Sequence, residues 1–247
     1  MTSLNSAGSR IVLPLDGMNS LEEISEVADG LNDLVGPFKL GLEAISEDLA
    51  HQAADYIIKV GGTIFWDGKF HDIPNTEGNA TAKVIKRHPS GIWAVNVHLT
   101  SGRKAIHEAV EKRGSANVLG VTLLTSISDE EAQEIYGSDA ATVVLRLAKI
   151  GVECGVQGLI CSPKEVPLMR SEFGDDLLLV TPGIRPAGAD AQDQARVETP
   201  RSAILSGADY LVIGRPITQA EDRREAARSI ALEIAAAFVL REGREGN

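Results

Sequence analysis

The chain has 247 residues, a length that fits either two small domains or one large one. Hydrophobic residues make up 43% of it, yet no continuous apolar stretch approaches the roughly 20 residues of a membrane-spanning helix. The formal charge of −11 at pH 7 opposes binding to nucleic acid or to an anionic membrane, because either partner requires a surplus of Lys and Arg on one face.

The start of the chain lacks the apolar stretch of a secretion signal, so we expect a flexible end over residues 1–10 and a cytoplasmic protein. Two cysteines follow much later in the chain. Cys154 falls at a predicted helix end and Cys161 in an apolar strand, without metal-ligand spacing. We therefore interpret both as reduced, structural thiols.

Short β-rich runs alternate with longer helical segments along the whole chain, which is typical of βαβ units around a parallel sheet. The eight predicted strands are Ile11–Asp16, Phe38–Gly41, Thr63–Lys69, Trp93–His98, Leu119–Leu124, Gly158–Ser162, Leu177–Thr181 and Tyr210–Gly214. Ser20 is suited to cap one of the intervening helices, and Thr199-Pro200 to begin another. Eight such units predict an α/β fold, a (β/α)8 TIM barrel, as a single domain over residues 11–241 with a polar tail over 242–247.

The longest irregular stretch lies between the seventh predicted strand and its helix. It runs from Pro186 to Glu198 and is rich in Ala, Asp, Gln and Gly. Loops of this length in compact domains are often active-site lids, so we expect this one to cover the site.

Charged residues gather at the end of the third predicted strand, in the segment Asp67-Gly68-Lys69-Phe70-His71-Asp72. Because alternate strand residues share a face, Asp67 and Lys69 are expected to be neighbours at the carboxyl end, where barrel enzymes place their active sites. By itself this spacing is more often explained by solvated loop charges.

Other strands bring polar groups to the same rim. They supply Asp16, Lys39, Asn96, His98 and Thr125. This convergence favours a functional site over isolated loop charges. We interpret His71 and His98 as hydrogen-bonded core or rim histidines, because neither has a partner at metal-ligand spacing.

A second group follows the seventh and eighth strands, where barrel loops often hold phosphate. The segments are Thr181–Pro186 and Ile213–Pro216. Their glycines let main-chain amides approach phosphate oxygens, and Arg185 or Arg215 offers a permanently charged fork. Each loop alone could equally be a Gly-Pro turn with a surface arginine, but the pair favours a phosphate site.

These residues resemble the orotidine 5′-monophosphate decarboxylase family from end to end. The matching stretches are Leu15-Asp16, Phe38–Gly41, Phe70–Thr76, Asn96–His98, Leu124–Ser126, Val180–Pro186 and Val212–Pro216. The resemblance implies conversion of orotidine 5′-monophosphate to uridine 5′-monophosphate and carbon dioxide, the last step of UMP biosynthesis, without cofactor or metal.

The resemblance also implies roles for particular residues. It gives a charged tetrad of Lys39, Asp67, Lys69 and Asp72, with Lys69 as the proton donor. It further implies a homodimer in which Asp72 and Thr76 reach the neighbouring active site.

For substrate binding, the resemblance implies that Asp16 and Lys39 contact the ribose hydroxyls and that Thr125 contacts the pyrimidine. It also implies that Gln194 closes down from the lid, and that Gly214 and Arg215 hold the phosphate with Arg185 beside it. The chain departs from the family at Gly68, where many relatives carry an apolar residue such as Leu. We expect this change to alter strand packing and not the chemistry.

Two other functions remain open from the sequence. One is a sugar-phosphate decarboxylase, aldolase-type synthase or epimerase, in which a related Asp-x-Lys-x-x-Asp motif stands beside a magnesium-stabilised enediolate. The other is a non-catalytic barrel that only binds nucleotides. The pyrimidine-side matches argue against the first, and the intact tetrad against the second.

Overall fold

Eight parallel strands close into a barrel in the computed structural model, which describes residues 4–186 and 198–245. The strands are β1 (Ile11–Pro14), β2 (Phe38–Leu40), β3 (Ile64–Phe70), β4 (Ile92–His98), β5 (Asn117–Val121), β6 (Gly158–Ile160), β7 (Leu178–Thr181) and β8 (Tyr210–Val212). Each pairs with its neighbours in sequence order, and β8 pairs with β1. The predicted (β/α)8 barrel is confirmed.

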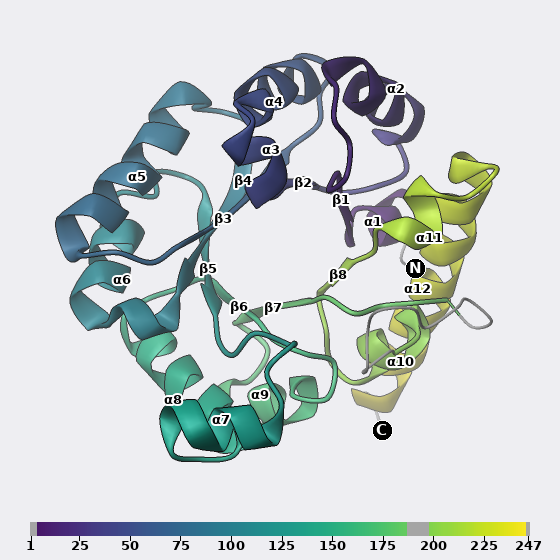
Figure 1. The fold of residues 1–247 in the computed structure, drawn as a ribbon. Coiled ribbons are helices and arrows are strands. Elements are labelled where there is room, and N and C mark those ends of the chain that lie inside the picture. Colours follow the sequence, from purple (N-terminus) through teal and green to yellow (C-terminus); the bar gives the residue numbers. More distant parts are fainter. Residues whose placement is uncertain (1–3, 187–197, 246–247) are drawn as a thin grey trace.

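Helices surround the barrel on all sides (Figure 1). They are α1 (Leu4–Gly8), α2 (Leu21–Leu31), α3 (Leu42–Ser46), α4 (Leu49–Lys59), α5 (Pro74–Arg87), α6 (Arg103–Glu111), α7 (Asp129–Tyr136), α8 (Ala140–Glu153), α9 (Val166–Phe173), α10 (Pro200–Leu205), α11 (Arg215–Thr218) and α12 (Arg223–Glu245). The predicted caps are present: the Ser20 side chain accepts a hydrogen bond from the Glu23 amide, and Thr199 one from the Ser202 amide. Among the described residues, no helix has the length and apolar character to cross a membrane.

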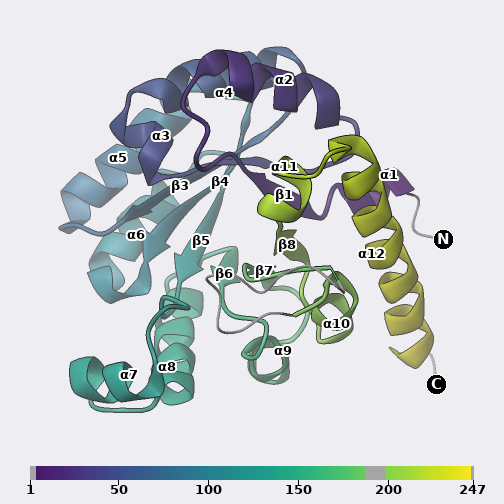
Figure 2. The same cartoon turned by 45° about the vertical axis from the view of Figure 1, so that its right-hand side comes forward.

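The start of the chain contains a short helix that was not predicted from the sequence. Leu4–Gly8 form α1, which packs beside α12 (Figure 2), and Ala7 is fully buried. A helix this short is unstable alone, so contact with α12 accounts for it. A local sequence pattern cannot predict a contact between segments so far apart in the chain.

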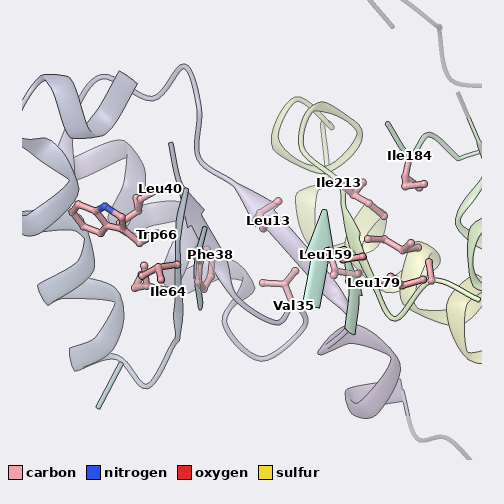
Figure 3. Packing of buried hydrophobic residues seen from close by; sticks show 14 of the residues in the cluster. Leu13, Val35, Phe38, Leu40, Ile64, Trp66, Leu159, Leu179, Ile184 and Ile213 are labelled. Carbon is pink, nitrogen blue, oxygen red and sulfur yellow. The ribbon is translucent and has the colours of Figure 1, made fainter. Parts of the chain in front are cut away.

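Two layers of apolar side chains hold the barrel. A small cluster fills its interior: Val12, Phe65, Ala94, Leu119 and Val180. A much larger cluster lies between the strands and the helices; Figure 3 shows Leu13, Phe38, Trp66 and Leu179 among its members. Adjacent strand residues such as Val12 and Leu13 thus pack in different clusters, as the alternation of side chains along a strand requires.

The described strands are mostly shorter than predicted, which changes where the polar residues lie. β1 ends at Pro14 and β5 at Val121, so Asp16 and Thr125 stand in the loops beyond the strand ends. β3 instead continues to Phe70, with a register shift against β4 between Trp66 and Phe70. The irregularity falls on the segment that carries Lys69.

Candidate active site

A row of alternating charges crosses the carboxyl ends of β1, β2 and β3. Lys39 Nζ lies 2.7 Å from Asp16 Oδ2 and 2.9 Å from Asp67 Oδ2. Lys69 Nζ lies 2.7 Å from Asp67 Oδ1. The structure therefore brings together the predicted residues Asp16, Lys39, Asp67 and Lys69, and Asp67 connects the two lysines.

The middle of this row is buried. Lys39 is 7% exposed and Asp67 is 5% exposed. Burial alone lowers the pKa of Lys39, but the charges of Asp67 and Asp16 outweigh it and the pKa is raised. Burial likewise raises the pKa of Asp67, and Lys39 and Lys69 outweigh it, so that this pKa is lowered. Both residues are held in their charged forms.

Asn96, on β4, fixes the end of β3. Its Nδ2 donates a hydrogen bond to Asp67 Oδ1 at 2.6 Å, and its Oδ1 accepts one from the main-chain amide of Lys69 at 2.7 Å. Lys69 has a φ of 44°, a left-handed conformation that residues other than glycine rarely adopt. Asn96 is fully buried and supports this strained backbone. The sequence placed Asn96 at the rim without assigning it this role.

Gly41 and Glu43 shape the Asp16 end of the row, and neither was predicted from the sequence to have a function. A Cβ atom at Gly41 would lie 2.3 Å from Asp16 Oδ1 and 3.1 Å from Lys39 Nζ. Glu43 Oε2 accepts a hydrogen bond from the Gly17 amide at 2.9 Å and so holds the loop that carries Asp16. The absent side chain of Gly41 leaves the room that the Asp16–Lys39 pair occupies.

Two adjoining cavities open beside the charged row. One, of about 220 Å³, has Lys39, Asp67, Lys69 and Thr125 in its wall. The rest of that wall is apolar and consists of Phe65, Val121, Leu123, Leu124, Ile160, Pro182 and Val212. The second cavity, of about 490 Å³, is lined by polar groups that include Asp16, Glu43, Gly183, Arg185, Gly214 and Arg215. Both cavities are lined by Lys39, Pro182 and Val212, so they lie next to each other.

The second cavity contains the predicted phosphate-binding residues. Arg185 is 7% exposed, and its Nη1 donates to the Ile184 carbonyl at 2.9 Å. Arg215 begins α11, directly after Gly214. Gly183 has a φ of 80°, which favours glycine in this loop. Two guanidinium groups and two glycine-containing turns therefore border a single cavity, as an anion site requires.

The remaining predicted residues lie elsewhere. Asp72 and Thr76 are exposed, and in the described part of this chain no hydrogen bond or salt bridge joins Asp72 to Lys69. Gln194 lies outside the described residues. The rings of His71 and His98 meet edge to face at the rim, 5.7 Å apart, and burial lowers the pKa of His98.

Gly68 leaves room for two aromatic side chains. A Cβ atom there would lie 2.9 Å from Phe70 Cε1 and 3.2 Å from Trp66 Nε1. The expected change of strand packing at Gly68 stays a prediction, and a side chain there would meet Trp66 and Phe70 on the side away from the charged row. Within residues 4–186 and 198–245, no three or more His, Cys, Asp or Glu side chains are grouped as metal ligands would be.

Comparison with known proteins identifies relatives over nearly the whole chain. Residues 9–230 match the family described as "Orotidine 5'-phosphate decarboxylase / HUMPS family". Orotidine 5′-phosphate decarboxylase from Geotalea daltonii is 39% identical over 93% of this chain and 98% of its own length. The protein of that name from Hahella chejuensis is 40% identical over 92% of this chain and 97% of its own. The crystal structure of the Lactobacillus acidophilus enzyme of that name superposes with a TM-score of 0.78 at 33% identity, covering 91% of this chain and 98% of that one.

Proposed function

The chain belongs to the orotidine 5′-phosphate decarboxylase / HUMPS family, and we propose that it decarboxylates orotidine 5′-monophosphate with Lys69 as the proton donor. The product is uridine 5′-monophosphate, in the last step of UMP biosynthesis. The enzyme is thus a carbon–carbon lyase. We propose that it works in the cytoplasm. The observation that carries the proposal is the Lys39–Asp67–Lys69 array in the wall of the smaller cavity.

The reaction demands electrostatic help. Loss of carbon dioxide from C6 leaves an electron pair in the plane of the pyrimidine ring, where the ring π-system cannot delocalise it. A fixed positive charge beside C6 lowers the energy of that carbanion, and a proton must then replace the carboxylate. An ammonium group supplies both the charge and the proton.

Lys69 is suited to this role by its partners. Its Nζ is held by Asp67 at 2.7 Å, next to the apolar side chains of the smaller cavity. The Lys69 side chain is 31% exposed, so it can reach a ligand in the cavity. Asp67 itself is fixed by Lys39 and Asn96. The charged groups around Lys69 therefore need to move little during the reaction.

The two cavities suit the two ends of the substrate. In the proposal, the pyrimidine occupies the smaller cavity with Thr125 beside it, and Asp16 with Lys39 contacts the ribose hydroxyls. The phosphate lies in the larger cavity on Gly214 and Arg215, with Arg185 beside it, and Gln194 closes over the ligand from its loop. Binding energy at the phosphate end then orients C6 against Lys69.

The proposed catalytic unit is a homodimer. Asp72 and Thr76 are exposed and border neither cavity of their own chain, so they are available to a neighbouring active site. Two large apolar side chains are also exposed: Ile73, between Asp72 and Thr76, at 66%, and Leu42 at 53%. In the partner's site, Asp72 completes the tetrad of Lys39, Asp67 and Lys69.

The direct test follows the ultraviolet absorbance of orotidine 5′-monophosphate mixed with the purified protein. We expect the absorbance to fall with the wild-type chain and to remain constant with Lys69→Ala. Binding of a nucleoside monophosphate without turnover, measured by calorimetry, would instead indicate the non-catalytic barrel.

A chelator separates the proposal from the magnesium-dependent alternative. An enediolate enzyme loses activity when its metal is removed, whereas a reaction stabilised by the Lys69 ammonium does not. We expect unchanged decarboxylation after dialysis against EDTA. A loss that added Mg²⁺ reverses would contradict the proposed mechanism.

A further inference from the structure

Glu77 is a buried carboxylate at the barrel rim that the proposed reaction leaves unused. It lies in the first turn of α5 and is 1% exposed. Its Oε2 accepts a hydrogen bond from the main-chain amide of Asp72 at 3.1 Å, and its Oε1 accepts one from the Ser101 hydroxyl at 3.1 Å. Glu77 thus joins the turn after β3 to the short 3₁₀ helix η1 (Leu99–Ser101) after β4.

This carboxylate is costly to keep where it is. Burial raises the pKa of Glu77, and no Lys or Arg among the described residues forms a salt bridge with it. A buried charge without an opposite charge destabilises a fold more than an apolar side chain of similar volume would. A gain in stability therefore does not explain why Glu stands at this position. What Glu77 contributes is its two hydrogen bonds, to the Asp72 amide and to Ser101.

Those bonds act on the turn that carries Asp72. Glu77 accepts from the Asp72 amide, and the Asp72 carboxylate itself accepts from the next amide, that of Ile73, at 2.7 Å. Two consecutive main-chain amides are therefore engaged. The Asp72 side chain projects from a backbone that is fixed on both sides, although the residue itself is exposed.

We propose that Glu77 is a positioning residue that fixes the Asp72 carboxylate for the neighbouring subunit's active site. The inference rests on the proposed function, because it requires Asp72 to act across a dimer. A carboxylate on an exposed turn samples many orientations, and misplacement by about 1 Å can cost a hundredfold in rate. Glu77 removes that freedom before the substrate binds.

Single variants test the hydrogen bonds. Glu77→Ala and the bulkier Glu77→Leu, which fills the space, both remove the acceptor for the Asp72 amide. Each should lower kcat/KM by roughly ten- to a hundredfold. Glu77→Gln should stay within about threefold of wild type, because its amide oxygen accepts from Asp72 and its nitrogen can donate to the Ser101 hydroxyl. Ser101→Ala, which leaves the Asp72 bond intact, and the exposed Glu134→Ala serve as controls.

Mixed dimers test whether the effect belongs to the chain that donates Asp72. When Lys69→Ala and Asp72→Ala chains are mixed, the mixed dimer has one complete site, with Lys69 from the second chain and Asp72 from the first. Adding Glu77→Leu to the Lys69→Ala chain should lower this restored activity by the same factor as in the single variant. Adding it to the Asp72→Ala chain should leave the restored activity unchanged.

The outcomes separate the inference from the function on which it rests. Equal losses with Glu77→Leu on either chain, or a further loss when it is added to an Asp72→Ala homodimer, would overturn the positioning role. So would a Glu77→Gln variant as inactive as Glu77→Leu. If the two parent chains restore no activity when mixed, Asp72 does not act across the dimer, and the proposed catalytic unit itself fails.

Discussion

Asn96 is the residue whose removal should disturb the charged row most selectively. It holds Asp67 by one bond and the strained backbone of Lys69 by another. Replacing it with Ala leaves both partners without this support, at a cost of about 1–3 kcal/mol. Steady-state kinetics of Asn96→Ala should show kcat/KM reduced roughly ten- to a hundredfold, chiefly through kcat. An unchanged kcat would mean that Lys69 keeps its position without Asn96.

His88 makes the fold sensitive to acid. It is 3% exposed, with Nδ1 lying 3.2 Å from Asp55 Oδ1 and Nε2 lying 3.0 Å from His51 Nδ1. Burial lowers the pKa of His88 below 6.5, and His51 and Arg87 lower it further, while Asp55 raises it. As the pH falls, the unfolded chain therefore protonates His88 before the folded chain does. The contribution of neutral His88 to the free energy of unfolding is complete above about pH 6.5 and is lost as the pH falls below it.

The lowered pKa of His88 predicts a measurable change of the thermal midpoint with pH. The thermal midpoint of the wild-type chain should fall between pH 7.5 and about pH 5.5, and the fall should be smaller for His88→Gln. His107→Gln is the matched control, because His107 is exposed on α6. Parallel slopes for wild type and His88→Gln would show that His88 does not contribute.

Single residues also mark the limit of what the sequence predicts. Alternation along a strand correctly predicted the contact between Asp67 and Lys69. The role of Asn96 and the need for Gly41 depend on distances between different strands, which no local pattern contains. The left-handed φ of Lys69 is likewise invisible in a sequence where that position reads as ordinary strand.

At the scale of elements, Gly68 couples the packing of β3 to two aromatic rings. Gly68→Leu would place atoms where Trp66 and Phe70 now lie and should lower the free energy of unfolding by about 1–3 kcal/mol. Combining it with Trp66→Ala should cost less than the sum of the two single changes, with a coupling of about 0.5–3 kcal/mol. Denaturant titrations of the four chains measure this coupling. Strict additivity would mean that the new side chain avoids Trp66.

The elements themselves were predicted best where their signals are local. Each barrel strand is a short apolar run between turn residues, so all eight were predicted, and the Ser20 and Thr199 caps mark helix starts. Strand ends were less accurate, because a strand stops where its neighbour stops pairing. The helix α1 was missed because it depends on α12, which lies more than 200 residues away in the chain.

At the scale of the whole molecule, the proposed dimer predicts an unusual response to dilution. Specific activity should fall when the protein is diluted below its dimer dissociation constant. An excess of Lys69→Ala chains should restore activity to dilute wild type, because those chains still donate Asp72. An excess of the Lys69→Ala, Asp72→Ala double variant should suppress the activity of the wild-type chains, because it pairs with them without donating Asp72. Activity that is independent of concentration and of both additions would favour a complete site in each subunit.

The charged row contains two carboxylates and two ammonium groups, so its formal charge is zero. A neutral row exerts little pull on a distant anion, and the chain around it carries −11. In the proposed binding mode, first capture of a phosphorylated ligand therefore falls to Arg185 and Arg215, which line the larger cavity. In this proposal recognition and chemistry occupy different ends of the site, and added salt, by screening the two guanidinium groups, should slow the encounter while leaving the bond-breaking step unaffected.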